Sequence, residues 1–199
     1  DYSLPATLTG HTRGVPCLAI WGGKLFSGSN DGTIKVWKCS DRSLITTLTQ
    51  HTDSVYDLVI HGDKLFSAGH DHTINVFNCS TNALITTLTG HTGPVLCLKI
   101  HDGKLYSSSW DHTINIWNCS TNKLIKTLTG HTDAVDCLKI HDGKLYSSSD
   151  DNTIKVWDCS DCKLIATLEG HTSHVNRFHF QNDKLYTKDV NRVIKIWKL

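Results

Sequence analysis

A short phrase recurs five times in this chain at a spacing of 40 residues. Each copy begins with Gly-His, or Gln-His in the second, near positions 10, 50, 90, 130 and 170. An aromatic residue closes each block at the same offset, in the order Trp37, Phe77, Trp117, Trp157 and Trp197. A period in this range indicates a repeat architecture in which each block is one structural unit. Residues common to all blocks are therefore expected to build the fold, and residues that differ are available for function.

The third block illustrates the secondary structure that every block predicts. Runs rich in β-branched and aromatic residues predict four strands over residues 95–100, 104–108, 113–117 and 124–128. Turn residues such as His101-Asp102-Gly103 separate these runs, and no longer segment has a helical period. One antiparallel meander cannot bury both of its faces alone. The pattern therefore predicts an all-β fold in which the sheets stack radially as the blades of a β-propeller.

The two ends of the chain predict how such a ring closes. Residues Leu4 to Gly10 match Leu164 to Gly170, which form a fourth strand, whereas the chain ends after a third strand at residues 194–199. We therefore expect the N-terminal strand to complete the last blade. This gives five four-stranded antiparallel blades in a single domain over residues 1–199, with Pro5 on an outermost strand. A closed ring predicts a monomer, and the alternative is an oligomer in which several copies form a larger ring.

Composition limits the classes of partner. The net charge is +1 and charged residues are dispersed, which argues against nucleic acid or an anionic membrane as a partner. No apolar run has the length of a membrane helix and no leader is visible, so a cytoplasmic location is expected. The cysteines fall mainly on two repeat positions, where a small apolar side chain suits the fold, and we expect them to be reduced and structural. No metal ion and no cofactor is predicted.

Three recurring features carry a family resemblance. Gly-His opens each block, an Asp precedes the third strand in four blocks, and a Trp follows that Asp by six residues in three of them. In these features the chain resembles the WD40-repeat family over its whole length, and Trp157-Asp158 has the dipeptide that names it. The compact blocks are most similar to repeats of ubiquitin-ligase substrate receptors and kinase-associated propellers. The resemblance implies a non-enzymatic scaffold or adaptor that binds a protein or peptide.

Each block also holds the residue types of a Ser-His-Asp catalytic triad. A set that recurs five times without a Gly-rich elbow is better explained as structure. The resemblance implies buried tetrads, each joining Asp, His, Ser and the Trp ring. Their predicted members, block by block, are His11, Ser27, Asp31, Trp37; His51, Ser67, Asp71, Phe77; His91, Ser107, Asp111, Trp117; His131, Ser147, Asp151, Trp157; and His171, Thr187, Asn191, Trp197. Phe77 lacks an N–H and Asn191 lacks a carboxylate, so blocks two and five are expected to be the least rigid.

Function is expected where the blocks differ. Many differences fall in two loops at one end of the strands, and in related propellers that rim binds proteins. The predicted protein-binding residues are Tyr56, His70, Pro94, Leu96, Trp110, Asp136, Asp150 and His174. Trp110 is the sharpest candidate because other blocks place Asn, His, Asp or Val at its position, so the fold does not require a large ring there. The absence of Arg from these positions argues against recognition of a phosphopeptide.

Two alternatives remain open at this point. A carbohydrate-binding propeller would be expected to repeat an exposed aromatic residue in every blade, and Trp110 occurs once. The chain could also be the substrate-recognition part of a larger ubiquitin ligase or kinase. An enzyme is the least favoured class, because nothing outside the repeated Ser, His and Asp residues suggests one.

Overall fold

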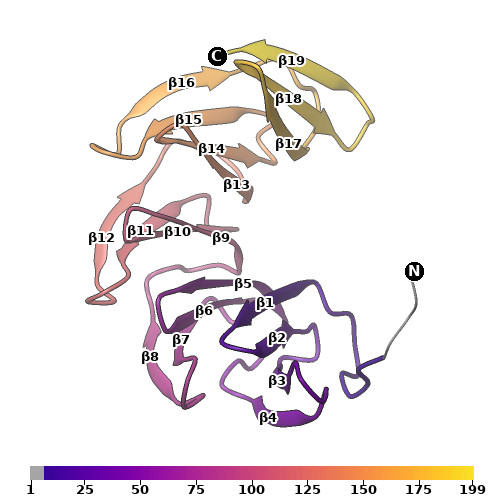
Figure 1. Cartoon of the computed structure of the whole chain (residues 1–199). Coiled ribbons are helices and arrows are strands. Elements are labelled where there is room, and N and C mark those ends of the chain that lie inside the picture. Colours follow the sequence, from indigo (N-terminus) through magenta and orange to yellow (C-terminus); the bar gives the residue numbers. More distant parts are fainter. Residues whose placement is uncertain (1–6) are drawn as a thin grey trace. The chain divides into compact units, whose positions relative to one another are not determined.

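The computed structural model describes residues 7–199, which form nineteen strands in five antiparallel sheets (Figure 1). No helix is found among these residues, and so none that could span a membrane. The chain divides into two compact units, residues 1–89 and 90–199. Sheets one and two belong to the first unit, and sheets three, four and five belong to the second.

Each sheet is a meander in which strands that follow one another in the chain are hydrogen-bonded neighbours. The first unit contains β1 (Cys17–Trp21), β2 (Lys24–Gly28), β3 (Ile34–Lys38), β4 (Leu44–Leu48), β5 (Val55–His61), β6 (Lys64–Gly69), β7 (Ile74–Asn78) and β8 (Leu84–Leu88). The second unit contains β9 (Val95–His101), β10 (Lys104–Ser109), β11 (Ile114–Asn118), β12 (Leu124–Leu128), β13 (Val135–His141), β14 (Lys144–Ser149), β15 (Ile154–Asp158), β16 (Leu164–Leu168), β17 (Val175–Gln181), β18 (Lys184–Asp189) and β19 (Ile194–Lys198).

The four strands predicted for the third block are confirmed to within a residue at each end. The first hairpin shows why the local sequence specifies them. His101 pairs with Lys104, which leaves Asp102 and Gly103 as a two-residue loop. Their φ angles are 46° and 68°, the left-handed values that a type I′ turn requires and that Asp and Gly tolerate. This turn matches the right-handed twist of the strands that it joins.

In the first unit, sheets one and two bury a shared apolar core. Phe26 and Val36 of sheet one are fully buried and cluster with Leu65 and Phe77 of sheet two. Side chains alternate along each strand, so each sheet presents one apolar row to its neighbour. The packing therefore follows directly from the alternation that the sequence displays.

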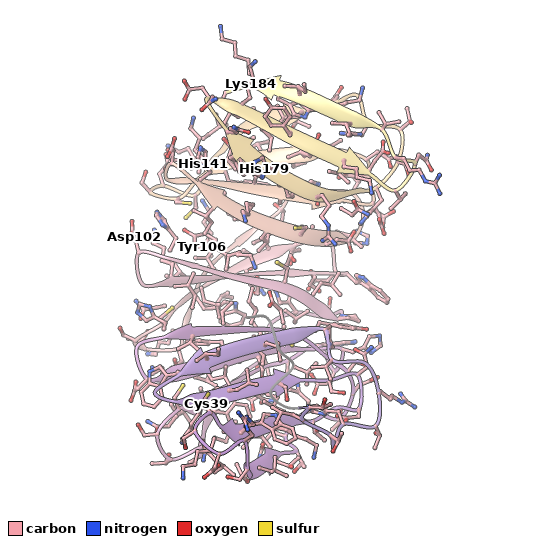
Figure 2. The ribbon with its side chains drawn as sticks, turned by 45° about the vertical axis from the view of Figure 1, so that its right-hand side comes forward. Cys39, Asp102, Tyr106, His141, His179 and Lys184 are labelled. Carbon is pink, nitrogen blue, oxygen red and sulfur yellow. The ribbon has the colours of Figure 1, made fainter. Side chains whose placement is uncertain are left out.

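In the second unit the same packing occurs twice. Tyr106 of sheet three, labelled in Figure 2, lies in a core with Leu138 and Leu145 of sheet four, and its hydroxyl donates to the Cys159 carbonyl at 3.4 Å. Tyr146 of sheet four likewise packs in a cluster with residues of sheet five. The first strands of these sheets, β9, β13 and β17, contact one another in series along one edge of the unit (Figure 1).

The predicted closing strand lies only partly within the described residues. Leu4, Pro5 and Ala6 fall outside them, and residues 7–10 are described but form no strand. Within the described residues, sheet five has three strands, β17, β18 and β19. Closure by the N-terminal strand therefore stays a prediction.

Candidate functional site

The His, Ser, Asp and Trp residues of the third block form a continuous hydrogen-bonded network. His91 Nδ1 lies 2.7 Å from Asp111 Oδ2, and His91 Nε2 lies 2.8 Å from Ser107 Oγ. The Trp117 indole donates to the same Ser107 Oγ at 2.9 Å. Ser107 is fully buried, and its oxygen already has two partners. This hydroxyl has no access to a substrate, so the network is structural rather than catalytic.

The network recurs in sheets one and four with nearly the same distances. His11 contacts Asp31 and Ser27 at 2.9 and 2.8 Å, and His131 contacts Asp151 and Ser147 at 2.7 and 2.8 Å. Trp37 and Trp157 each donate to the serine at 2.9 Å. In sheet two, His51 contacts Asp71 at 2.9 Å and Ser67 at 2.7 Å, and the buried Phe77 provides no donor to Ser67.

The prediction for sheet five is wrong at one residue. His171 Nδ1 pairs with Asp189 Oδ2 at 2.8 Å, and Asn191 is exposed. Thr187 accepts the Trp197 indole hydrogen at 2.8 Å and lies 2.8 Å from His171 Nε2. Asp189 is fully buried at the end of β18, two residues before the position that holds the carboxylate in the other sheets. Sheet five therefore keeps a charge-assisted partner for its histidine, and the expected loss does not occur.

The repeated carboxylates are held in their ionised form. Burial would raise the pKa of Asp111, but hydrogen bonds from His91 and Thr113 outweigh it, and the pKa falls well below its usual range. The pKa of His131 is lowered, chiefly because burial disfavours the charged imidazolium. A neutral imidazole that donates through Nδ1 to Asp151 and accepts a hydrogen from Ser147 satisfies every group of this network.

The predicted rim residues are placed as follows. Trp110 and Asp150 are exposed, and Tyr56, His70, Leu96, Asp136 and His174 are half-buried. Pro94 is buried, which corrects the expectation that it contributes to an exposed patch. Its carbonyl instead accepts the Trp110 backbone N–H at 3.0 Å, a bond that ties the two loops of sheet three together.

Two of these residues belong to the first unit and interact there. The rings of Tyr56 and His70 meet edge to face, with centroids 5.9 Å apart. His70 Nδ1 also lies 3.0 Å from Asp53 Oδ2, and Asp53 was not among the predicted residues. Because Tyr56 and Trp110 lie in different units, a single patch containing both stays a prediction.

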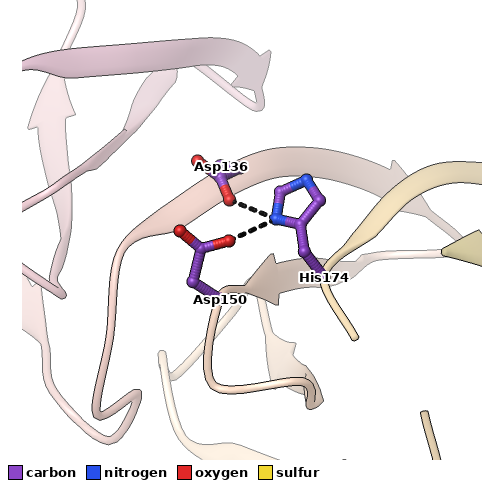
Figure 3. A group of neighbouring side chains, drawn as sticks. All are labelled: Asp136, Asp150 and His174. Carbon is purple, nitrogen blue, oxygen red and sulfur yellow. Dashed lines mark hydrogen bonds and ion pairs between the residues drawn. The ribbon is translucent and has the colours of Figure 1, made fainter. Parts of the chain in front are cut away.

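Three of the predicted residues converge in the second unit (Figure 3). Asp136 lies on β13, Asp150 lies in the turn between β14 and β15, and His174 directly precedes β17. His174 Nδ1 lies 2.5 Å from Asp150 Oδ1 and 2.7 Å from Asp136 Oδ2. One ring nitrogen carries one hydrogen, which Asp150 receives, so Asp136 Oδ2 makes an ion pair but no hydrogen bond. We call these three residues the His174 cluster.

The His174 cluster has unusual electrostatics. Burial raises the pKa of Asp136 to about 6; His174 opposes this shift, and Asp150 adds to it. The ligand atoms of the three residues lie within 4.8 Å of one another. His174 Nδ1 is already in contact with both carboxylates, so we assign the cluster as a His–Asp contact and not as a metal site. Its net character is acidic, which favours a cationic group as a contact.

Comparison with known proteins identifies the repeat. The family model described as WD domain, G-beta repeat, matches residues 2–38, 42–78, 82–118 and 122–158. Among solved structures, the chain is similar to the computationally designed Ika8 protein, with a TM-score of 0.87 over 96% of this chain and 28% sequence identity. The chain covers 60% of the length of that designed protein. No curated protein matches. Four consecutive repeat matches that cover more than half of the sequence show that this chain belongs to the WD40-repeat family.

Proposed function

We propose that this chain is a non-enzymatic scaffold or adaptor that binds a protein or peptide through the loops at one end of its sheets. WD40 repeats generally mediate protein–protein interactions. The observation that carries the proposal is Trp110, whose side chain is 48% exposed in the turn between β10 and β11. Exposed Trp side chains are enriched at the energetic centres of interfaces. In this turn the indole is not needed for the core.

The chemistry of the partner follows from what lies at the same end of the second unit. Asp150 occupies in sheet four the turn position that Trp110 occupies in sheet three. It belongs to the acidic His174 cluster, and exposed Asp133 lies 3.9 Å from His112 in the adjoining loops. This combination fits a segment that presents an apolar side chain together with Lys or Arg. The unit thus offers one apolar anchor and an acidic border.

Quantitative affinity purification from cell extract tests this proposal with three variants. Trp110→Asp removes the anchor, and Asp150→Asn weakens the acidic border. Ile125→Asp is the matched control, because Ile125 is 49% exposed but lies on β12, away from these turns. We expect specific partners to be lost with Trp110→Asp, reduced with Asp150→Asn and retained with Ile125→Asp. Equal partner lists for Trp110→Asp and the wild type would contradict the proposal. Glycan binding that depends on Trp110 would support the carbohydrate alternative instead.

We also propose that residues 1–199 form one closed propeller of five blades, monomeric and cytoplasmic. The repeated way in which sheets pack within each unit supports the propeller. All eight cysteines are free thiols, as a reducing compartment would maintain them. The mass measurement described in the Discussion tests the closed monomer.

A further inference from the structure

The eighth residue of each block, counted from its opening Gly or Gln, varies in a way that the fold does not require. It is Cys17, Asp57, Cys97, Cys137 and Arg177 in blocks one to five. Only blocks three and four place a cysteine there in succession. Cys97 lies on β9 and Cys137 on β13, the first strands of two sheets that pack together.

The two thiols meet within the second unit. Both sulfur atoms approach the Leu138 carbonyl oxygen, Cys97 Sγ at 4.0 Å and Cys137 Sγ at 3.9 Å. The Cys97 side chain also interacts with the Cys137 sulfur and stabilises its thiolate form. Cys97 is buried and Cys137 is half-buried, so Cys137 is the more accessible of the pair.

The thiols line a groove of about 270 Å³ that also holds three cationic side chains beside neutral ones. Lys99, Lys139 and Arg177, from three adjacent first strands, contribute to the lining. The Cys97 side chain lowers the pKa of Cys137 to about 7, and the charges of these cations add to the effect against the opposing influence of burial. Cationic side chains next to a thiol favour the thiolate, which is the nucleophilic form.

Cys17 shows that the repeat position alone does not create this environment. It occupies the same place in sheet one, but its neighbour from the next sheet is Asp57. Burial, together with the charge of Asp57, raises the pKa of Cys17 to about 12. The same residue at the same repeat position therefore has opposite chemistry in the two units, and Cys17 is a matched control.

We propose that Cys137 and Cys97 form a redox-active dithiol that reacts with a hydroperoxide and closes to a disulfide between β9 and β13. In the first step the Cys137 thiolate attacks one oxygen of hydrogen peroxide and the O–O bond breaks. The attacked oxygen stays on the sulfur with its hydrogen as a sulfenic acid, and the other oxygen leaves as hydroxide, which takes up one proton to become water. In the second step the Cys97 sulfur attacks the Cys137 sulfur and displaces the hydroxyl group, which leaves as a second water with the Cys97 proton.

The electron balance is complete without another reactant. The two thiols lose two electrons in total, the peroxide gains them, and the products are one disulfide and two waters. The disulfide would link sheets three and four across their packed first strands, so oxidation would cross-link the second unit internally.

Treatment of the full chain with hydrogen peroxide, followed by peptide mass mapping, tests the proposal. We expect a Cys97–Cys137 disulfide as the first product, ahead of oxidation at the other six cysteines. Cys97→Ser should stop at a Cys137 sulfenic acid that dimedone traps. Cys137→Ser should abolish the fast reaction, and Cys17→Ser should leave it unchanged.

A second measurement separates a reactive thiol from a merely accessible one. The alkylation rate of Cys137 with iodoacetamide should rise with pH around a midpoint near 7, the value expected in this groove. Lys139→Glu reverses one charge at an exposed position and should shift the midpoint upward. Alkylation that requires pH above 8 in both proteins, or a first disulfide between any other pair, would overturn the proposal. Circular dichroism of each variant confirms that it is folded.

Discussion

At the scale of single residues, each buried histidine described above has a carboxylate partner, even where that carboxylate comes from a different position in the block. His171 needs a carboxylate within hydrogen-bond distance of Nδ1, and Asp189 supplies it from β18 instead of the following turn. The backbone N–H of Val193 also donates to Asp189, at 2.9 Å, which holds the carboxylate in place. A buried imidazole N–H is satisfied by whichever acceptor reaches it.

This assignment predicts different outcomes for two neighbouring substitutions. Asp189→Ala should lower the free energy of unfolding, because the buried His171 N–H would lose its acceptor at a cost of about 1–3 kcal/mol. Asn191→Ala, at an exposed position, should change it by less than about 0.5 kcal/mol. Urea denaturation of both variants checks this, and a larger effect for Asn191→Ala would restore the original assignment.

The His174 cluster predicts a pH-dependent stability. The pKa of Asp136 is raised in the folded state, so its contribution to stability is present below its unfolded value of about 3.8 and is lost as pH rises through about 6. Asp136→Asn has no such titration, so its stability relative to wild type should increase between pH 4 and pH 7. We expect about 1 kcal/mol, a figure reduced for the partial exposure of the carboxyl group.

Denaturation at several pH values measures this difference. Asp133→Asn, at a carboxyl group that is 57% exposed, is the control and should show no comparable trend. If Asp136→Asn lost stability relative to wild type as pH rose, the ion pair with His174 would dominate and the expected sign would be wrong.

At the scale of strands and sheets, the residue near the end of each second strand decides whether another sheet can pack on it. A side chain on Gly28 would meet Cys17 Sγ at 2.5 Å and a Val55 methyl carbon at 2.8 Å. The equivalent Ser148 is fully buried, whereas the equivalent Lys188 in sheet five is exposed. Sheet five therefore places a cation where the other four sheets hold Gly, Ala or Ser.

This contrast predicts that substitutions at Ser148 and at Lys188 have different effects on stability. Ser148→Lys should destabilise the protein by about 3 kcal/mol or more, because an unpaired ammonium would be buried between sheets four and five. Lys188→Ser should change stability by less than about 0.5 kcal/mol. Thermal unfolding of the two variants tests this. Equal losses would contradict the exposed placement of Lys188.

Strand β7 is predicted to be less protected than β11. Phe77 provides no donor to Ser67, whereas Trp117 donates to Ser107, so the network of sheet two has one bond fewer. Native-state hydrogen exchange should show faster exchange at β7, by roughly tenfold for about 1 kcal/mol of local stability. Faster exchange at β11 would contradict this, and Trp117→Phe should remove most of the difference.

At the scale of the whole molecule, a closed ring and an assembly of copies predict different masses. A chain that closes on itself leaves no sheet face open for another copy, so its mass should stay at 22.2 kDa over a wide concentration range. Copies joined through open faces, such as that of Leu18 (61% exposed) and Ile20 (71% exposed), should give multiples of this mass. Sedimentation equilibrium distinguishes the two.

The structural features that depend on a local sequence pattern were predicted correctly. The strands of the third block follow from alternation and turn residues, and the networks of sheets one, three and four join the residues that the repeat aligns. The prediction was wrong in block five, where Asn191 aligns with the carboxylates of the other blocks but Asp189 is the residue that contacts His171. The Ser-to-Asp change at position 189 could have signalled this, because a carboxylate appears there in the one block whose turn lacks it.

By itself, the sequence therefore determined the repeat, the all-β fold and the family, because each rests on spacing along the chain. Only the tertiary structure decided that Pro94 is buried, that Asp136, Asp150 and His174 converge, and that Cys97 meets Cys137. The last two of these features join residues from different blocks. At one repeat position, burial together with Asp57 raises the pKa of Cys17. The Cys97 side chain together with Lys99 and Lys139 lowers the pKa of Cys137, because these effects act through space and not along the chain.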